Sequence, residues 1–340
     1  MSPTPDLAQG LARALSTTWG ETAEIEIRDQ ASAGARRHNV LFDALRGGER
    51  IPLVATIIPN PAIQVMDVEV EAASLRLAES QGMPVPHVHG VWQDTSLVGG
   101  PFFVSTRIDG ETIPRQVLRL VEAHPGLGAT LAGQCGGALA RLHAADADKA
   151  HEGLIRPRED DCVVEQALTG VAALIGELLQ PSPSFTLGLR WLERHAPAPP
   201  ERLSVLHGDF RNGNLIVGDD GLRAVLDWEV GHLGDPMEDA AWLCMRMWRF
   251  RNDELEVGGF GQRAQLREGY EAAGGAWRDE AFHWWKVLGT LRWGLGLAGQ
   301  AKAHIDGSVP NIIMAASGRR VAELEYDLLM LLQPTDGAGR

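Results

Sequence analysis

Cysteine is scarce in this 340-residue chain, which contains only Cys135, Cys162 and Cys244. Three widely spaced cysteines are too few for a disulfide framework, and their spacing does not match a thiolate metal site. Because thiols stay reduced in the cytosol, we expect them to be small core residues of a cytoplasmic protein.

Long apolar runs are missing as well. No uninterrupted apolar stretch approaches the roughly 18 residues that a membrane span requires. Residues 1–6 also lack the basic and apolar pattern of a secretion signal. The sequence therefore predicts neither a membrane partner nor a targeting segment.

Basic residues are in the minority, with 31 Lys and Arg against 45 Asp and Glu, which gives a formal net charge of −14. This balance opposes binding to nucleic acid or to an anionic membrane. It would suit a cationic substrate, but a plain acidic surface is the simpler and favoured explanation. The length and the hydrophobic content of 44% are those of a globular protein with room for two lobes.

One segment carries most of the chemical signal. Residues 206–214 read Leu-His-Gly-Asp-Phe-Arg-Asn-Gly-Asn, and the chain later reads Asp227-Trp228-Glu229. An amide oxygen from Asn214 and a carboxylate from Asp227, completed by phosphate oxygens and water, would form the hard-oxygen environment that Mg²⁺ prefers. Asp209 would then be free to accept a proton from a hydroxyl nucleophile.

A hairpin is expected to bring these groups together. Short apolar runs at 215–217 and 222–226 flank Asp219-Asp220-Gly221, which is a strong turn signal. A hairpin centred between Asp220 and Gly221 places residue 214 opposite residue 227. Asn214 and Asp227 are therefore predicted to meet at one end, beside the His-Gly-Asp turn.

A buried hairpin with solvated acids at its ends is the simpler alternative for any one of these residues. The pattern is more demanding taken together, because it joins His-x-Asp, an Asn five positions after that Asp, and an Asp where the hairpin returns. The combination favours a kinase-like catalytic loop.

The segment from Leu206 to Trp242 resembles the aminoglycoside phosphotransferase family, and it is most similar to the branch found as kinase-like domains associated with acyl-CoA dehydrogenases. That branch carries His-Gly-Asp-x-x-x-x-Asn, then Asp-Trp-Glu, then Gly-Asp-Pro-x-x-Asp, which here ends at Asp239. The resemblance covers nearly the whole chain but is specific only in this segment. It implies that His207 holds the catalytic turn by hydrogen bonds.

The expected fold is α+β and two-lobed, like a protein kinase. A small antiparallel-sheet lobe over residues 1–106 would bind the nucleotide, and a mainly helical lobe over residues 107–340 would hold the catalytic and substrate groups. Sequence periodicity predicts these elements: helices at 5–18 and 65–80, and strands at 23–28, 36–44, 51–58, 88–92 and 102–106. In the second lobe, helical faces are formed by Leu127, Leu131, Cys135, Ala138 and Leu142, and by Val321, Leu324, Leu328 and Leu331.

The resemblance also implies a site for ATP or GTP. Backbone groups of Thr106 and Ile108 would receive the purine at the hinge between the lobes, although a buried strand running into a turn would look identical. The loop at residues 31–35, with Ser32 and Gly34, would cover the phosphates through its backbone N–H groups. A plain turn between strands is the alternative for that loop.

The third strand departs from the family. A Lys or Arg usually pairs there with the α- and β-phosphates and with a glutamate of the following helix, but this strand has Thr56 at about that position. Glu71 matches the helix glutamate, so its usual partner is missing. Arg36 or Arg37, beside the phosphate loop, could replace the cation. Alternatively, the chain has lost phosphoryl transfer and only binds a ligand, as a catalytically silent pseudokinase would.

Three further residues near this motif have expected roles. Asp239, at a predicted helix start, is expected to brace the catalytic loop, and Asp235 either does the same or faces substrate. Arg211 either neutralises the transferring phosphoryl group or pairs with an acid.

These observations predict a Mg²⁺-dependent phosphotransferase with an alcohol group as acceptor and ATP or GTP as donor. The carboxy-terminal helices are rich in aromatic and apolar residues, which favours a small hydroxyl compound less cationic than an aminoglycoside, such as a hydroxyacyl or polyketide-like alcohol. The residues of that stretch are Phe282, Trp284, Trp285, Leu288, Leu291 and Trp293. The silent pseudokinase is the first alternative to this function, and an aminoglycoside phosphotransferase is the second.

Overall fold

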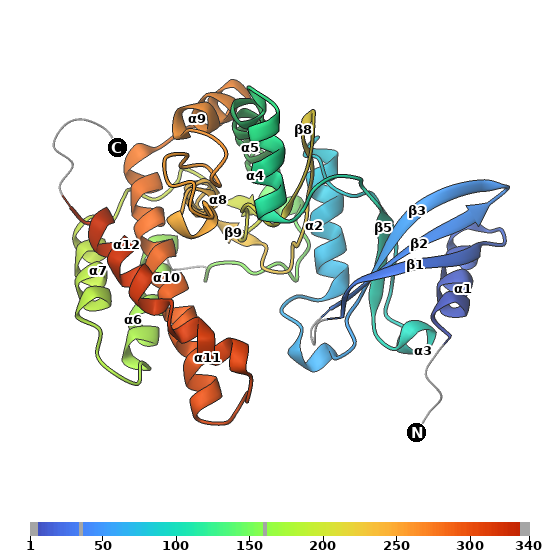
Figure 1. Ribbon diagram of the computed structural model, residues 1–340, viewed down its shortest axis with the longest axis horizontal. Helices are drawn as coiled ribbons and strands as arrows, with labels where there is room; N and C mark the ends of the chain where they lie inside the picture. The colour runs from blue at the N-terminus through green and yellow to red at the C-terminus, as the bar shows by residue number, and fades with distance from the viewer. Residues whose placement is uncertain (1–5, 34–36, 159–161, 334–340) are drawn as a thin grey trace.

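A five-stranded antiparallel sheet forms the core of the first lobe in the computed structural model, which describes residues 6–33, 37–158 and 162–333 (Figure 1). The strand order is β1-β2-β3-β5-β4. The strands are β1 (Glu24–Ala33), β2 (His38–Arg46), β3 (Glu49–Ile57), β4 (Val88–Trp92) and β5 (Phe102–Thr106).

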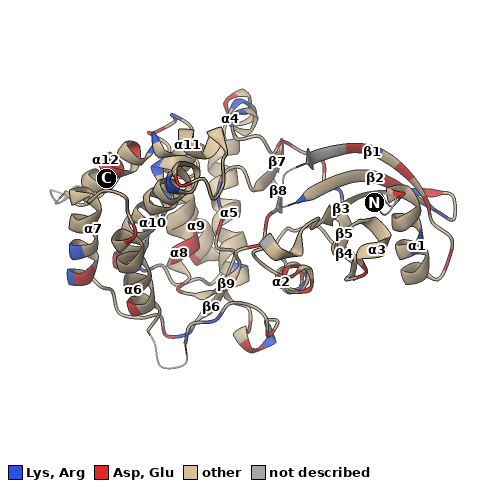
Figure 2. Ribbon diagram, turned by 90° about the horizontal axis from the view of Figure 1, so that it is seen from below, with Lys and Arg blue, Asp and Glu red and all other residues tan. Residues whose placement is uncertain are grey.

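Two helices pack on this sheet. Helix α1 (Leu7–Trp19) buries Leu11 and Leu15 against strand residues such as Phe42, and the short α3 (Thr95–Val98) lies beside it. Helix α2 (Val68–Ser80) packs on β4 and β5 and lies between the sheet and the helical lobe, as both Figure 1 and Figure 2 show. The α2 side chains belong to the larger core, so this helix joins the two lobes.

The second lobe is mainly helical. Its long central helix, α10, contacts five other helices of the lobe. The helices are α4 (Pro114–Ala123), α5 (Leu127–His143), α6 (Val163–Gly176), α7 (Pro183–Arg194), α8 (Met237–Leu243), α9 (Arg263–Ala272), α10 (Asp279–Ile305), α11 (Ile312–Gly318) and α12 (Val321–Leu331). Single 3₁₀ turns occur at η1 (Pro61–Ile63), η2 (Ala147–Lys149) and η3 (Arg246–Trp248).

Two small sheets hold the motif region. Strand β6 (Ser204–Leu206) pairs with β9 (His232–Gly234), and β7 (Leu215–Gly218) pairs with β8 (Gly221–Val225). Helix α5 contacts β6 and β8. It also packs closely on α9, because glycines let the two backbones approach. A Cβ added at Gly136 would lie 2.0 Å from the carbonyl oxygen of Leu266.

The predicted α+β, two-lobed kinase-like fold is confirmed, and β4 and β5 have the predicted bounds. The other predicted bounds of this lobe differ by one or two residues, except for two that are wrong by three or more. Strand β1 continues to Ala33, because its edge pairs with β2 beyond the expected turn, and α2 begins at Val68, because Asp67 caps it by accepting a hydrogen bond from Glu69 N. Strand β5 ends at Thr106, where the chain leaves the sheet; the division into units at 1–106 and 107–340 stays a prediction.

None of the helices in the described ranges has the length and apolar character that a bilayer crossing requires. Cys135 and Cys244 are buried and Cys162 is half-buried, and all three are free thiols. Burial raises the pKa of the Cys135 and Cys244 thiols far above the usual range, so both are inert packing residues. Acidic and basic residues are interspersed along both lobes (Figure 2).

Candidate active site

The hairpin β7–β8 places Asn214 and Asp227 at the same end, but with a different register from the one predicted. Asn214 lies opposite Leu226, whose N–H donates to the Asn214 carbonyl at 2.8 Å, and not opposite Asp227. The difference arises because the turn is centred between Asp219 and Asp220, with Gly218 paired to Gly221, and not between Asp220 and Gly221; a bulge at Arg223 in the returning strand makes up part of the shift. Asp227 follows with φ of 67°, a left-handed conformation that is rare outside glycine and concentrated at functional sites.

Asp209 is held by three hydrogen-bond donors. Its Oδ2 accepts from Asn214 Nδ2 at 2.7 Å, its Oδ1 accepts from Trp242 Nε1 at 2.7 Å, and Arg211 Nε lies 3.0 Å from both oxygens. The carboxylate keeps 20% side-chain exposure, so a ligand can reach it from solvent. Its orientation is thus fixed before any substrate binds.

His207 fixes the backbone of the turn. Its Nδ1 accepts a hydrogen bond from the Asp209 N–H at 3.1 Å, so Nε2 carries the proton and donates to the Leu226 carbonyl at 2.9 Å. The imidazole is fully buried and joins the catalytic turn to the return of the hairpin. With both nitrogens used in this way, His207 is a structural residue and not a base.

Asp239 braces the same turn from α8. Its carboxylate accepts from the backbone N–H groups of His207 and Gly208, both at 2.8 Å, and from His143 Nε2 at 3.2 Å. Burial alone would raise the pKa of Asp239, but the hydrogen bonds from the His143 side chain and from the backbone N–H of His207 hold it below the usual value. A buried ionised carboxylate therefore anchors the turn that carries Asp209.

Asp235 is also buried and also structural. Its carboxylate accepts a hydrogen bond from Met237 N at 3.0 Å and pairs with Arg278 at 2.8 Å. These contacts cap α8 and tie it to the start of α10, so Asp235 does not face a substrate.

The residues predicted to hold Mg²⁺ fit that metal by their chemistry. The Asn214 amide nitrogen points to Asp209, which leaves its oxygen for a cation, and the Asp227 side chain is 38% exposed. No cluster of three His, Cys, Asp or Glu that could hold a metal exists within the described ranges. Two protein oxygens completed by water and phosphate are what Mg²⁺ usually takes, whereas a metal that needs a full protein cage would not fit.

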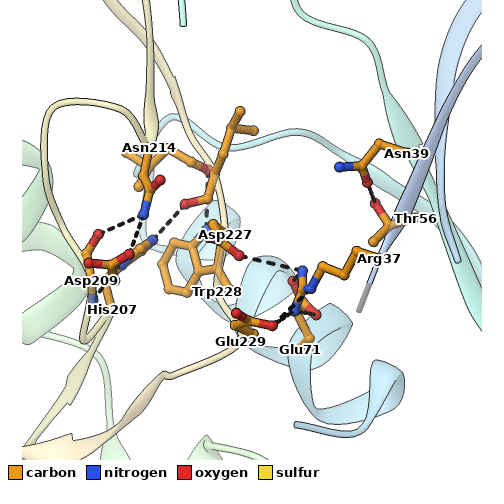
Figure 3. A network of polar contacts seen from close by, with 12 residues as sticks. Arg37, Asn39, Thr56, Glu71, His207, Asp209, Asn214, Asp227, Trp228 and Glu229 are labelled. Atoms are coloured by element: carbon orange, nitrogen blue, oxygen red, sulfur yellow. Dashed lines mark hydrogen bonds and ion pairs between the residues drawn. The ribbon is translucent and has the colours of Figure 1, made fainter. Parts of the chain in front are cut away.

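Arg37 lies where the third-strand cation is missing. Its guanidinium forms two hydrogen bonds of 2.9 Å with the two carboxylate oxygens of Glu71, the helix glutamate that seemed to lack a partner. It also lies 2.9 Å from Glu229 and 3.6 Å from Asp227. In Figure 3, Asp227 therefore lies between two groups, with Asp209 and Asn214 on one side and Arg37 and Glu71 on the other.

The usual position of the cation is occupied by a neutral pair. Thr56 on β3 is 7% exposed, and its hydroxyl donates to Asn39 Oδ1 on β2 at 3.0 Å (Figure 3). Asn39 and Thr56 are direct partners across the two strands. Arg37 immediately precedes β2, so the guanidinium that pairs with Glu71 of α2 comes from the start of β2 and not from β3.

This cluster has unusual electrostatics. Burial by itself lowers the pKa of Arg37, but Glu71, Glu229 and Asp227 together raise it above the ordinary value. Burial of Glu71 in turn raises the pKa of that carboxyl, which Arg37 opposes. The three carboxylates around one guanidinium carry an excess of negative charge, so a further cation at Asp227 would be favoured.

The predicted nucleotide residues are placed as follows. Thr106 ends β5, its N–H donates to the His87 carbonyl at 2.9 Å, and Ile108 follows in the segment that connects the lobes. Ser32 belongs to β1, where it pairs with Asn39, so it is not in a free loop as predicted. Gly34 and Arg36 lie outside the described residues.

Two contacts of this site were not predicted. Trp242 binds Asp209, and Glu229 binds Arg37, and neither pair carries a signal in the residue types alone. The contact of Arg211 with Asp209 is one of the two alternatives predicted for Arg211, namely pairing with an acid.

A separate cavity of about 410 Å³ lies among α6, α7, α10 and α12, lined by residues such as Phe185, Leu295 and Lys302. None of the motif residues contributes to it. The chemistry of the site therefore belongs to the open edge around Asp209 and Asp227 and not to this cavity.

Comparison with known proteins gives a consistent result. The model of the phosphotransferase enzyme family matches residues 28–278. Acyl-CoA dehydrogenase family member 10 of Mus musculus is 28% identical over 180 residues, which is 52% of this chain and 16% of that protein. Acyl-CoA dehydrogenase family member 11 of Homo sapiens is 26% identical over 164 residues, which is 48% of this chain and 21% of that protein. The chain thus spans a small part of the length of these relatives.

Solved structures share the fold at low sequence identity. A Ralstonia eutropha protein provisionally described as an aminoglycoside phosphotransferase has a TM-score of 0.74 at 19% identity, covering 95% of this chain and 97% of that one. A macrolide 2′-phosphotransferase of Brachybacterium faecium has a TM-score of 0.58 at 18% identity, covering 98% and 100%. An aminoglycoside phosphotransferase in ternary complex with AMP-PNP and hygromycin B has a TM-score of 0.61 at 18% identity, covering 94% and 98%.

Proposed function

The chain belongs to the phosphotransferase enzyme family, and we propose that it is a Mg²⁺-dependent kinase that transfers the γ-phosphoryl group of ATP or GTP to the hydroxyl of a small molecule. The observation that carries this proposal is the position of Asp227. It lies between the catalytic turn, with Asp209 and Asn214, and the ion pair of Arg37 with Glu71 (Figure 3). A nucleotide bound there would meet a base, two oxygen ligands and a cation.

Asp209 is assigned as the base that orients the acceptor hydroxyl and accepts its proton. As the proton leaves, the acceptor oxygen forms a bond with the γ-phosphorus, and the bond from that phosphorus to the β–γ bridging oxygen breaks with its electron pair staying on the diphosphate. The neighbouring donors of Asp209 keep its carboxylate in one orientation, which supplies part of the rate enhancement by positioning.

Asn214 and Asp227 would hold Mg²⁺ through the amide oxygen and the carboxylate. The metal, when bound, supplies positive charge against the phosphates. Asp227 has an unusual φ of 67°, and its carboxylate points toward Arg37 in Figure 3, where the phosphates of a nucleotide would lie.

Arg37 is assigned the role of the missing third-strand cation, pairing with the α- and β-phosphates. Glu71 holds its guanidinium in place by two hydrogen bonds. We keep Arg36, Ser32 and Gly34 as candidate phosphate contacts, since they adjoin Arg37 in the chain. Thr106 would offer the purine its carbonyl oxygen, since its N–H is used within the sheet, and Ile108 would offer its N–H.

The acceptor is proposed not to be an aminoglycoside. The indoles of Trp242, Trp248 and Trp293 lie against one another beside Asp209, with ring centroids 5.1 to 6.0 Å apart. Aromatic faces suit an apolar body, whereas a polycationic sugar would need several free carboxylates. An aminoglycoside acceptor predicts that expression raises drug tolerance of a sensitive host, and we expect no such rise.

One observation favours the silent alternative. Thr56 is neutral, and three carboxylates lie around Arg37. These carboxylates already neutralise the guanidinium charge, which weakens its attraction for a phosphate. A protein of this kind would bind a nucleotide or metabolite without turnover.

Calorimetric titration with ATP and with GTP, each with and without Mg²⁺, tests the proposal. We expect micromolar binding that depends on Mg²⁺, together with slow nucleotide hydrolysis that is lost in Asp227→Ala. If neither nucleotide binds, the kinase assignment fails. Binding without any hydrolysis in the parent protein would establish the silent alternative instead.

A further inference from the structure

The guanidinium of Arg37 is held on two of its edges. It carries five N–H donors in a rigid planar fork. At the end of the fork, Nη1 and Nη2 each lie 2.9 Å from an oxygen of Glu71. Along one side, Nε and Nη2 each lie 2.9 Å from Oε2 of Glu229. The group therefore cannot turn in its own plane without breaking one of these contacts.

The contact of Arg37 with Asp227 is looser. Nη1 lies 3.6 Å from Asp227 Oδ1, which is longer than a hydrogen bond. Figure 3 shows the guanidinium between Asp227 above it and Glu229 with Glu71 below it. Glu71 and Glu229 thus fix the group, while its side toward Asp227 faces the position where the metal and the phosphates would bind.

The two fixed contacts come from different parts of the molecule. Glu71 lies on α2 with its side chain 2% exposed, whereas Glu229 follows β8 in the second lobe with its side chain 21% exposed. Arg37 belongs to the first lobe and lies just outside β2. A cation on β3, at the position of Thr56, would be held by the strand that carries it. Arg37 lacks that support, so a second contact is needed to fix it.

A metal ion at Asp227 makes this second contact more important. Two positive groups a few ångströms apart repel each other, and the repulsion is stronger in a partly buried site than in water. Held by Glu71 alone, Arg37 would turn away from the metal toward solvent. Glu229 opposes this turn, and its charge completes the balance, since three carboxylates match one guanidinium and one divalent cation.

We propose that Glu229 is a positioning residue, which keeps the Arg37 guanidinium beside Mg²⁺ and the phosphates when a nucleotide is bound. It acts from the second lobe on a cation of the first, so the contact also joins the two lobes at the site. The inference rests on the proposed kinase function and assigns a residue that this function leaves without a role.

The test is a thermodynamic cycle on nucleotide affinity. Glu229→Gln keeps the shape of the side chain and removes its charge, Arg37→Ala removes the group that it positions, and a third variant combines both changes. Calorimetry with Mg²⁺ and ADP, which cannot donate a γ-phosphoryl group, measures the dissociation constant of each protein. Glu122→Gln, at an exposed position of α4, is the matched control.

We expect Glu229→Gln to weaken the binding of ADP with Mg²⁺ about tenfold, as the loss of a hydrogen bond between charged groups would, and to have no effect once Arg37 is alanine. The control should bind like the parent. Unchanged or tighter binding in Glu229→Gln would overturn the inference and leave the kinase function standing. An equal loss with and without Arg37 would also overturn it, since Glu229 would then act independently of Arg37. A parent protein that binds no nucleotide would contradict the kinase function itself, and the inference would fall with it.

A second background separates positioning from a general effect of charge or folding. Arg37→Ala combined with Thr56→Lys places the cation within β3, where Glu71 would pair with it and Glu229 is not needed. We expect Glu229→Gln to lower kcat/KM for ATP hydrolysis about tenfold in the parent and not to lower it in this background. An equal loss in both would show that Glu229 supports the fold or the charge of the site and not the position of Arg37.

Discussion

The turn that carries Asp209 and the edge of the first lobe that carries Arg37 are built in opposite ways. In the turn, Asp209 is bound by residues that lie within 33 positions of it, and every contact falls between β6 and α8. At the lobe edge, Arg37 joins Glu71, 34 positions away, and Glu229, 192 positions away. One site is local in sequence and the other is assembled across both lobes.

The difference shows what each chemistry needs. A base must present one carboxylate at a defined angle to the acceptor, and such geometry comes from a short rigid turn. A cationic side chain that binds phosphate must supply its positive charge close to the phosphate oxygens. Coulomb attraction depends on that distance and not on which strand carries the residue. With the roles proposed above, the base would need a sequence motif, whereas the cation could come from β3 or, as Arg37 does, from the residue before β2.

The largest effect should come from Asp209. Asp209→Asn keeps the size of the side chain but removes the negative charge that accepts the proton, so we expect turnover to fall about 10³-fold with nucleotide affinity unchanged. Steady-state kinetics and calorimetry measure the two quantities. The control is Asp220→Asn, the same change at the exposed turn of the hairpin, which should be silent. A fully active Asp209→Asn variant would show that Asp209 is not the base, and the turn would then have no catalytic role to compare.

Arg37 tests the other side. Arg37→Ala should slow turnover about 10²-fold or more and weaken Mg²⁺-nucleotide binding, because Glu71 and Asp227 lose their shared cation. Adding Thr56→Lys to that variant places a cation at the usual third-strand position and should restore part of the activity. Arg46→Ala, at the far end of β2, is the control. Unchanged turnover and affinity in Arg37→Ala would show that the charge has not moved to this residue.

Asp239 should affect stability more than chemistry. Asp239→Ala leaves the N–H groups of His207 and Gly208 buried without an acceptor, and we expect a loss of about 3 kcal/mol in the free energy of unfolding. Urea denaturation measures this, with the exposed Asp306→Ala as control. Since the pKa of Asp239 is lowered in the folded state, its contribution is present at neutral pH and is lost as the pH falls below the ordinary carboxyl range. If the free energy of unfolding of the parent did not fall at acid pH, this account would be contradicted.

The smallest effect concerns pH. His232 contacts Glu238 beside the catalytic turn. Burial alone would lower the pKa of His232, but Glu238 and Asp239 raise it above its usual value of 6.5. A raised folded pKa gives stability that is complete below pH 6.5 and is lost as the pH rises through the folded pKa. The midpoint of thermal unfolding should therefore fall as the pH rises above 6.5, and this slope should be weaker in His232→Gln; equal slopes would refute the pairing.

Much of the first lobe could be predicted because its strands alternate and end at clear turn residues. The bounds of β4 and β5 follow from this, whereas the end of β1 does not, because pairing with β2 carries the strand through residues with no strand pattern of their own. The register of the hairpin was missed because Asp219-Asp220-Gly221 allows more than one turn centre, and the structure places the turn at Asp219-Asp220, with Gly221 already paired to Gly218. The bulge at Arg223, an ordinary strand residue by its type, was not predicted either.

The sequence by itself determined that Asp209, Asn214 and Asp227 share one end of a hairpin. The segment from residue 209 to residue 227 is short and contains a strong turn signal, so its two ends must lie close together. The tertiary structure alone decided that Arg37 meets Glu71 and that Trp242 meets Asp209. Such pairs depend on how separate elements pack, and neither residue type nor spacing encodes the distance between them. Local geometry is set by short-range chain stiffness, while the placing of a charge is set by the whole fold.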